Sequence, residues 1–148
     1  MGTRVYIPVG IVASGKSTAC RQWAEKNDAV IVEADVFRTI FHRKYVYDPS
    51  TEYIIRSIME KSTIVWSNHG VNVAVDDAVS FLSKWNRVQF RSAVKREAWN
   101  AVQFTWDFLP LPTDEEVVER RGREGRGYSV EQWLEVAHKQ REELEYDG

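Results

Sequence analysis

The sequence has a single cysteine, Cys20, so no disulfide framework can hold its fold together. It also lacks an apolar run of the roughly 20 residues that a membrane-spanning helix needs, and no signal peptide precedes its first predicted strand. We therefore expect a cytoplasmic protein without membrane association. Cys20 is expected to be a small core residue.

A strong charge excess is missing as well. The 20 basic and 22 acidic residues give a net charge of −2, which excludes a generic nucleic-acid coat but leaves room for a small basic cleft. The three histidines are scattered without the spacing of metal ligands. What the sequence does have is a hydrophobic content of 43%, enough for one folded domain over residues 1–148.

The most informative segment is Gly10–Thr18, which reads GIVASGKST and is a complete G-x-x-x-x-G-K-[ST] phosphate-binding loop. Its glycines let backbone N–H groups close around phosphate oxygens, while Lys16 reaches the β- and γ-phosphates and the Ser17 hydroxyl ligates Mg²⁺. A helix follows, and its N-terminus favours an anion. We therefore expect ATP and Mg²⁺ as cofactors. The predicted nucleotide-binding residues of the loop are Gly10, Ala13, Ser14, Gly15, Lys16, Ser17 and Thr18.

Strand patterns alternate with helical ones along the chain, which predicts an α/β fold with a parallel sheet and helices on both faces. We expect a P-loop kinase fold with about four strands in the order 2-3-1-4. The predicted strands are 4–9, 29–33, 71–75 and 101–108. The predicted helices are 17–26, 35–42, 50–66, 80–97, 113–121 and 130–146. The last strand alternates apolar and polar residues, which favours an edge position. Pro8 fits a central strand only near its end, and the six tryptophans are predicted to be mostly core residues.

Ligands of such sheets bind beyond the carboxyl ends of the strands, and a first polar cluster follows the second strand there. Asp35 is placed to accept the proton of an attacking hydroxyl. Arg38 lies one helical turn further on the same face and could bind an acceptor phosphate with its guanidinium group. The alternative interpretation is that Asp35 is a helix N-cap and Arg38 a surface charge.

A second cluster, Asp76-Asp77, ends the third strand. A carboxylate there could hold Mg²⁺ through water or orient a basic residue. Because strand alternation sends the two side chains in opposite directions, the sequence leaves open which of them faces the site. The alternative is a loop turn with a helix cap.

The third cluster is the segment 120–127, which has four arginines among three glycines between two predicted helices. This is the composition of a mobile lid. A lid arginine can neutralise charge on the transferring phosphoryl group, and closure excludes water. The alternative is a solvated charged turn.

Together these motifs resemble the kinase domain of the bacteriophage-type 5′-polynucleotide kinases and their small bacterial relatives. The shared pattern is G-x-x-x-S-G-K-S-T, then D-x-x-R after the second strand, an acidic residue after the third, and an arginine-bearing lid. One departure is Asp77-Ala78-Val79, where the family commonly has D-T-N. The resemblance covers nearly the whole chain, in order.

This resemblance implies a role for each matching residue. Asp35 would be the general base, and Arg38 would bind the phosphate beside the acceptor hydroxyl. Asp77 would match the acidic residue after the third strand and would bind the metal together with Ser17. The remaining predicted site residues are Lys16 and Thr18 on the ATP phosphates, Arg123 or Arg120 as the lid arginine, and Arg126 beside the nucleotide.

The leading functional prediction is ATP-dependent transfer of the γ-phosphate to a hydroxyl of a nucleic acid, at a 5′ end or on a modified base. A kinase of nucleotides, nucleosides or other small metabolites is the first alternative, because nucleic-acid binding usually leaves a basic footprint. The second alternative is an NTP-binding switch module that is not a kinase.

Overall fold

The computed structural model describes residues 2–42, 48–77, 79–122 and 127–146 of the chain. Within these residues, four strands form one parallel sheet in the order β2-β3-β1-β4. The strands are β1 (Thr3–Val9), β2 (Val30–Glu33), β3 (Val73–Asp76) and β4 (Val102–Phe108). The predicted α/β class, parallel sheet and strand order are therefore confirmed.

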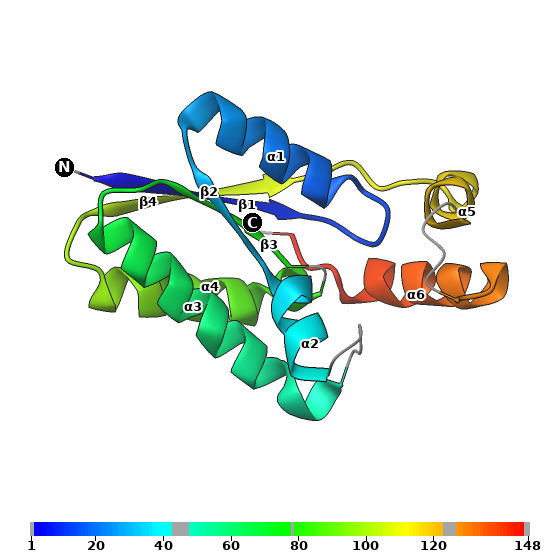
Figure 1. Ribbon diagram of the computed structural model, residues 1–148. Coiled ribbons are helices and arrows are strands. Elements are labelled where there is room, and N and C mark those ends of the chain that lie inside the picture. Colours follow the sequence, from blue (N-terminus) through cyan, green and yellow to red (C-terminus); the bar gives the residue numbers. More distant parts are fainter. Residues whose placement is uncertain (1, 43–47, 78, 123–126, 147–148) are drawn as a thin grey trace.

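The helices lie on both faces of this sheet (Figure 1). They are α1 (Lys16–Asn27), α2 (Ala34–His42), α3 (Glu52–Asn68), α4 (Lys84–Glu97), α5 (Asp114–Gly122) and α6 (Val130–Glu143), with short 3₁₀ helices η1 (Pro49–Thr51) and η2 (Ser80–Leu82). α1 covers one face, α3 and α4 cover the other, and α5 and α6 lie beyond the carboxyl ends of β1 and β4. The loops that follow β1, β2 and β3 thus meet at one edge of the sheet.

The strands follow from their residue patterns. β1 is buried along nearly its whole length, as expected of a central parallel strand, and contributes Val5, Ile7 and Val9 to the main core. Pro8 lies opposite Asp107 of β4, beyond the residues of β1 that pair with β3. Its missing N–H therefore falls near the end of the strand, as predicted. β4 pairs with β1 alone among the described strands, so the predicted edge position is confirmed.

Two predicted helices differ from the structure. The expected helix over 80–97 is divided into η2 and α4, because Ser83 has extended backbone and its side chain accepts a hydrogen bond from Asn86 N at 3.3 Å as the N-cap of α4. The last helix ends at Glu143 rather than Tyr146.

The prediction for the tryptophans is wrong at three positions. Trp66, Trp85 and Trp99 are 42%, 69% and 81% exposed, whereas Trp133 is buried. Helical spacing identified the helices of Trp66 and Trp85 but not which side faces the sheet, and Trp99 lies past the end of α4. Cys20 is fully buried, as predicted.

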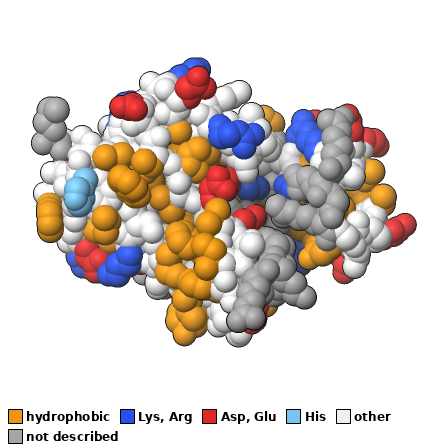
Figure 2. Space-filling view, viewed as in Figure 1, with side chains coloured by type: hydrophobic (Ala, Val, Ile, Leu, Met, Phe, Trp, Pro, Cys, Tyr) orange, Lys and Arg blue, Asp and Glu red, His pale blue; other side chains and the backbone are white. Residues whose placement is uncertain are grey.

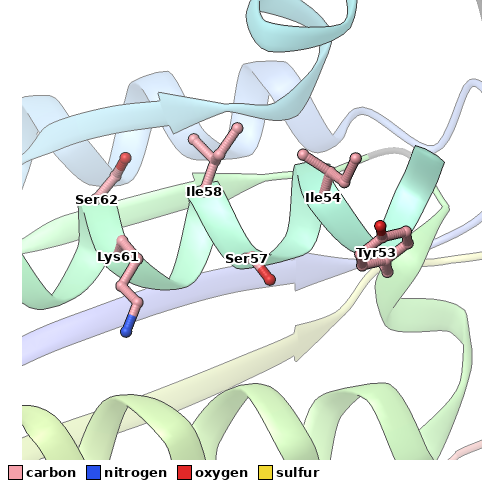
Figure 3. A pocket seen from close by; sticks show the side chains of 6 residues that line it. All are labelled: Tyr53, Ile54, Ser57, Ile58, Lys61 and Ser62. Carbon is pink, nitrogen blue, oxygen red and sulfur yellow. The ribbon is translucent and has the colours of Figure 1, made fainter.

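Hydrophobic side chains also gather on the outside of the molecule over α3 (Figure 2). A hollow of about 380 Å³ lies on the outer side of this helix, and the six residues that line it all come from α3 (Figure 3): Tyr53, Ile54, Ser57, Ile58, Lys61 and Ser62. None of them belongs to the phosphate-binding loop. Across the described ranges of the chain, no helix has the length and apolarity to span a bilayer.

Candidate active site

The phosphate-binding loop joins β1 to α1 and closes tightly on itself. A Cβ atom on Gly10 would lie 2.3 Å from Ser14 Oγ, so only glycine fits there without moving the loop. Ala13 and Gly15 have positive φ angles of 65° and 92°, which turn the backbone toward the N-terminus of α1. Ser14 Oγ is buried and has no hydrogen-bond partner in the described part of the chain. A polar atom in this position fits a loop built to receive phosphate oxygens.

Lys16 lies folded over this loop. Its Nζ donates hydrogen bonds to the carbonyl oxygens of Gly10 at 2.9 Å and Ile11 at 2.8 Å. Burial lowers the pKa of Lys16 to about 8, although the carboxylate of Asp76 opposes this shift. A triphosphate would offer the ammonium group a stronger partner than two carbonyl oxygens. Ser17 and Thr18 lie exposed on the first turn of α1.

The two helices beyond the sheet edge contact the loop directly. Val12 N donates to Gln140 Oε1 of α6 at 2.6 Å, and Arg120 of α5 donates to the carbonyl oxygen of Ala13 at 2.5 Å. Arg121 stacks on Trp133, 5.3 Å from its ring centre, and its charge helps to lower the pKa of Lys16. α5 thus brings two arginines to the phosphate-binding loop.

Only part of the predicted lid can be compared with the structure. Arg120 lies against the loop, and its role in nucleotide binding stays a prediction. Arg121 was part of the predicted segment but was not selected as a site residue. Arg123 and Arg126 lie outside the described residues.

The two aspartates at the end of β3, Asp76 within the strand and Asp77 just after it, have different surroundings. Ser17 Oγ donates to Asp76 Oδ2 at 2.7 Å. Burial raises the pKa of Asp76, the charges of Asp35 and Asp77 raise it further, and Ser17 and Lys16 oppose the shift. Asp76, rather than Asp77, therefore contacts Ser17. The structure differs here from the expected pairing of Ser17 with Asp77, because successive side chains at the end of a strand point to opposite sides.

Asp77 instead joins a buried cluster around Arg38, which is only 1% exposed. Arg38 donates to Asp77 at 3.0 Å, to Asp35 at 2.7 Å, and through two nitrogens to Glu52 of α3 at 3.0 and 2.6 Å. Asp77 also accepts hydrogen bonds from the backbone N–H groups of Val79 and Ser80. Burial pushes the pKa of Asp77 up, but Arg38 and the hydrogen bonds outweigh it and hold this pKa below its usual value.

This geometry corrects the role expected for Arg38. Its guanidinium group is surrounded by three carboxylates, so an acceptor phosphate would have to compete with all of them. Arg38 instead holds Asp35, whose side chain remains 34% exposed. Asp35 follows two residues after Glu33, which pairs with Asp76 across β2 and β3, and Asp76 contacts Ser17, so this carboxylate lies at the same strand ends as the phosphate-binding loop.

Two residues of the site carried no signal in the sequence. Glu52 looks like any acidic residue in the first turn of a helix, and no spacing links it to Arg38. Gln140 lies 128 residues from the backbone N–H that it binds. Only the packing of α3 and α6 brings these side chains to the edge of the sheet.

The side chains beside the loop fit Mg²⁺. Mg²⁺ usually takes one or two protein ligands and completes its shell with water and phosphate oxygens. Ser17 and Asp76 meet this requirement, and a bound cation would oppose the rise that burial causes in the pKa of Asp76. Asp77 does not fit, because it is buried against Arg38. Among the residues the structure describes, no group of three or more His, Cys, Asp or Glu side chains could hold a metal ion.

Comparisons with known proteins agree with this geometry. The profile of the AAA domain family matches residues 5–144. A chain of the Pnkp1/Rnl/Hen1 RNA repair complex superposes with a TM-score of 0.70 at 21% identity, over 98% of this chain and 47% of that one. A chain from another structure of the Pnkp1/Rnl/Hen1 complex gives 0.64 at 27% identity, over 80% of this chain and 38% of that one. This chain therefore spans less than half the length of either.

The Mycobacterium tuberculosis APS kinase CysC, solved with AMPPNP and APS, gives a TM-score of 0.63 at 18% identity, over 95% of this chain and 98% of that one. No match was found among the curated proteins. With a phosphate-binding loop, a four-stranded parallel sheet and P-loop kinases among its structural neighbours, the chain belongs to the AAA domain family and has a P-loop kinase fold.

Proposed function

We propose that this protein is an ATP-dependent phosphotransferase that transfers the γ-phosphate to a hydroxyl of a nucleic acid. The observation that carries the proposal is the position of Asp35. This carboxylate is partly exposed, is held by the buried Arg38, and follows the end of β2 beside the strand end whose Asp76 contacts Ser17 of the loop. A base that is held beside a triphosphate-binding loop can remove the proton of an acceptor hydroxyl.

In the proposed reaction, Asp35 accepts the proton of the acceptor hydroxyl as its oxygen bonds to the γ-phosphorus. The bond between the γ-phosphorus and the β–γ bridging oxygen breaks, and ADP leaves. Lys16 and the loop N–H groups stabilise the charge on the phosphate oxygens, with Arg120 and Arg121 close by. Mg²⁺, held by Ser17 and Asp76, would neutralise phosphate charge.

Two observations support a nucleic acid as the acceptor. The D-x-x-R motif and the arginine-bearing segment resemble those of 5′-polynucleotide kinases. One of the similar solved structures is a chain of an RNA repair complex. The acceptor hydroxyl would be at a 5′ end or on a modified base.

A small-molecule kinase is the second candidate, and the Arg38 cluster favours it. Three carboxylates surround the guanidinium group of Arg38, so this cluster is negatively charged and Arg38 has no face left for a phosphodiester. The chain also matches an APS kinase over nearly the whole length of that protein.

An acceptor screen with γ-labelled ATP separates the two candidates. We expect label on 5′-hydroxyl oligonucleotides, no label once the 5′ end is already phosphorylated, and a rate that falls steeply with salt. Transfer to nucleosides or sugars alone, with little salt dependence, would overturn the nucleic-acid proposal in favour of the small-molecule kinase.

The variant Asp35→Asn tests the chemistry itself. We expect it to abolish transfer while ATP binding persists, because the amide keeps the shape of the carboxylate but accepts no proton. Asp28→Asn, at an exposed position past the end of α1, is the matched control and should transfer normally. If Asp35→Asn leaves turnover unchanged, the protein is better described as an NTP-binding switch.

A further inference from the structure

Helix α4 is basic in an otherwise acidic protein. It carries five basic side chains and one acidic one, a charge of +4 within 14 residues, so the rest of the chain carries −6. Figure 1 shows α4 beginning below the carboxyl edge of the sheet and running back beneath it. This concentration of positive charge is a local electrostatic feature that the net charge conceals.

Three of these cations form a stripe on the solvent side of α4. Lys84, Arg91 and Lys95 recur at helical spacing and are exposed, whereas Arg87 is buried. The stripe is about 16 Å long at 1.5 Å per residue. In the part of the chain that the structure describes, none of the three forms an ion pair. Arg96 is exposed too, but it follows Lys95 directly and therefore points to another side of the helix.

Exposed tryptophans lie close in sequence to both ends of this stripe. Trp85, on the first turn of α4, is 69% exposed, and Trp99, two residues past its end, is 81% exposed. Trp99 is held through its backbone N–H, which donates to Asn68 Oδ1 at 2.7 Å. Tryptophan side chains are highly buried on average. Indole rings beside a row of cations are what single-stranded nucleic acids bind, with bases stacking on the rings and phosphates facing the cations.

We propose that the exposed side of α4 from Lys84 to Trp99 binds a single-stranded segment of nucleic acid, away from the nucleotide that is phosphorylated. This inference rests on the proposed function, because it identifies the acceptor as a strand several nucleotides long. It also supplies phosphate contacts that the buried Arg38 cannot make. A small hydroxyl acceptor would have no use for such a surface.

Direct binding tests the surface separately from the chemistry. The probe is a fluorescein-labelled 12-nucleotide single strand with a 5′-phosphate, titrated by anisotropy over a range of salt concentrations. For Arg91→Ala/Lys95→Ala we expect weaker binding and a slope of log K against log salt reduced by about 1.4, or about 0.7 per lost phosphate contact. The matched control is Arg21→Ala/Lys26→Ala, which removes two exposed cations from α1 on the opposite face of the sheet and should bind like the wild type.

The tryptophan contribution is tested with Trp85→Ala, which we expect to weaken binding at least about fivefold, while Trp85→Phe keeps most of the affinity. Equal affinities and salt slopes for the wild type, the α4 variants and the α1 control would overturn the inference. A second result would also overturn it: polyaspartate displaces the labelled strand as effectively as unlabelled oligonucleotide does, and Trp85→Ala has no effect. That result would indicate an acidic protein partner.

Acceptor length separates this inference from the proposed function. We expect Arg91→Ala/Lys95→Ala to raise KM for a 12-nucleotide 5′-hydroxyl acceptor while kcat, and all constants for a dinucleotide, stay unchanged. Transfer to both acceptors with no change in KM would refute the surface and leave the proposed function intact. Binding that depends on α4, with no transfer to any nucleic acid, would support the surface and refute the proposed function.

Discussion

Replacing Arg38 with alanine leaves two buried carboxylates, Glu52 and Asp77, without their cation. Arg38 contacts them at 2.6–3.0 Å, and their side chains are only 6% and 0% exposed. Breaking a buried pair from one side costs about 3–5 kcal/mol, because the remaining charge keeps its desolvation penalty. We expect Arg38→Ala to lose this much unfolding free energy at neutral pH.

The loss should also depend on pH. In the wild type the pKa of Asp77 is lowered, so its pairing stabilises the fold above the unfolded pKa and is lost as the pH falls through the folded pKa. Without Arg38, burial dominates and raises this pKa. The variant is then destabilised at neutral pH, where the buried carboxylate of Asp77 is charged. It regains stability when this carboxyl group takes up a proton. The stability gap between the two proteins should therefore narrow in acid.

Urea unfolding followed by circular dichroism measures this gap, at about pH 7 and about pH 4.5. Lys61→Ala is the control, because it breaks an exposed pair with Glu97 and should cost at most about 1 kcal/mol. Arg38→Met/Glu52→Met should recover part of the loss, since an apolar pair leaves one buried charge fewer. A loss for Arg38→Ala no larger than that of the control, or a gap that does not change with pH, would refute the reasoning.

Three further predictions concern the nucleotide site. Because the pKa of Lys16 is about 8, ATP binding should take up a proton above that pH, and Kd for ATP should rise about tenfold per pH unit there. Calorimetry in two buffers measures the proton uptake. Lys16→Arg should remove this uptake. Gly10→Ala should weaken ATP binding at least about tenfold, since its methyl meets Ser14 Oγ at 2.3 Å, and adding Ser14→Gly should restore part of the affinity; unchanged binding by Gly10→Ala contradicts this. Asp76→Asn should weaken ATP binding with Mg²⁺ more than without it, whereas Asp77→Asn should mainly lower the melting temperature; equal effects of the two variants would be the contrary result.

Features that depend on neighbouring residues could be predicted from the sequence alone. The spacing of Gly10, Gly15 and Lys16 specified the phosphate-binding loop, because backbone conformation and side-chain reach are local properties. Alternating polarity in β4 identified an edge strand, since an edge strand of this sheet is only partly covered. The position of Asp35 after the second strand followed from the rule that parallel strands end at one edge.

Only the tertiary structure decided which charges meet. Asp76 and Asp77 are adjacent, yet one contacts Ser17 and the other Arg38. Arg38 has the spacing of a phosphate ligand, but Glu52 and Asp77, 14 and 39 residues away, enclose it. Local patterns specify which elements form, whereas the direction of a side chain at the end of an element depends on how helices pack on the sheet. That packing turned Arg38 inward and left Trp85 and Trp99 exposed.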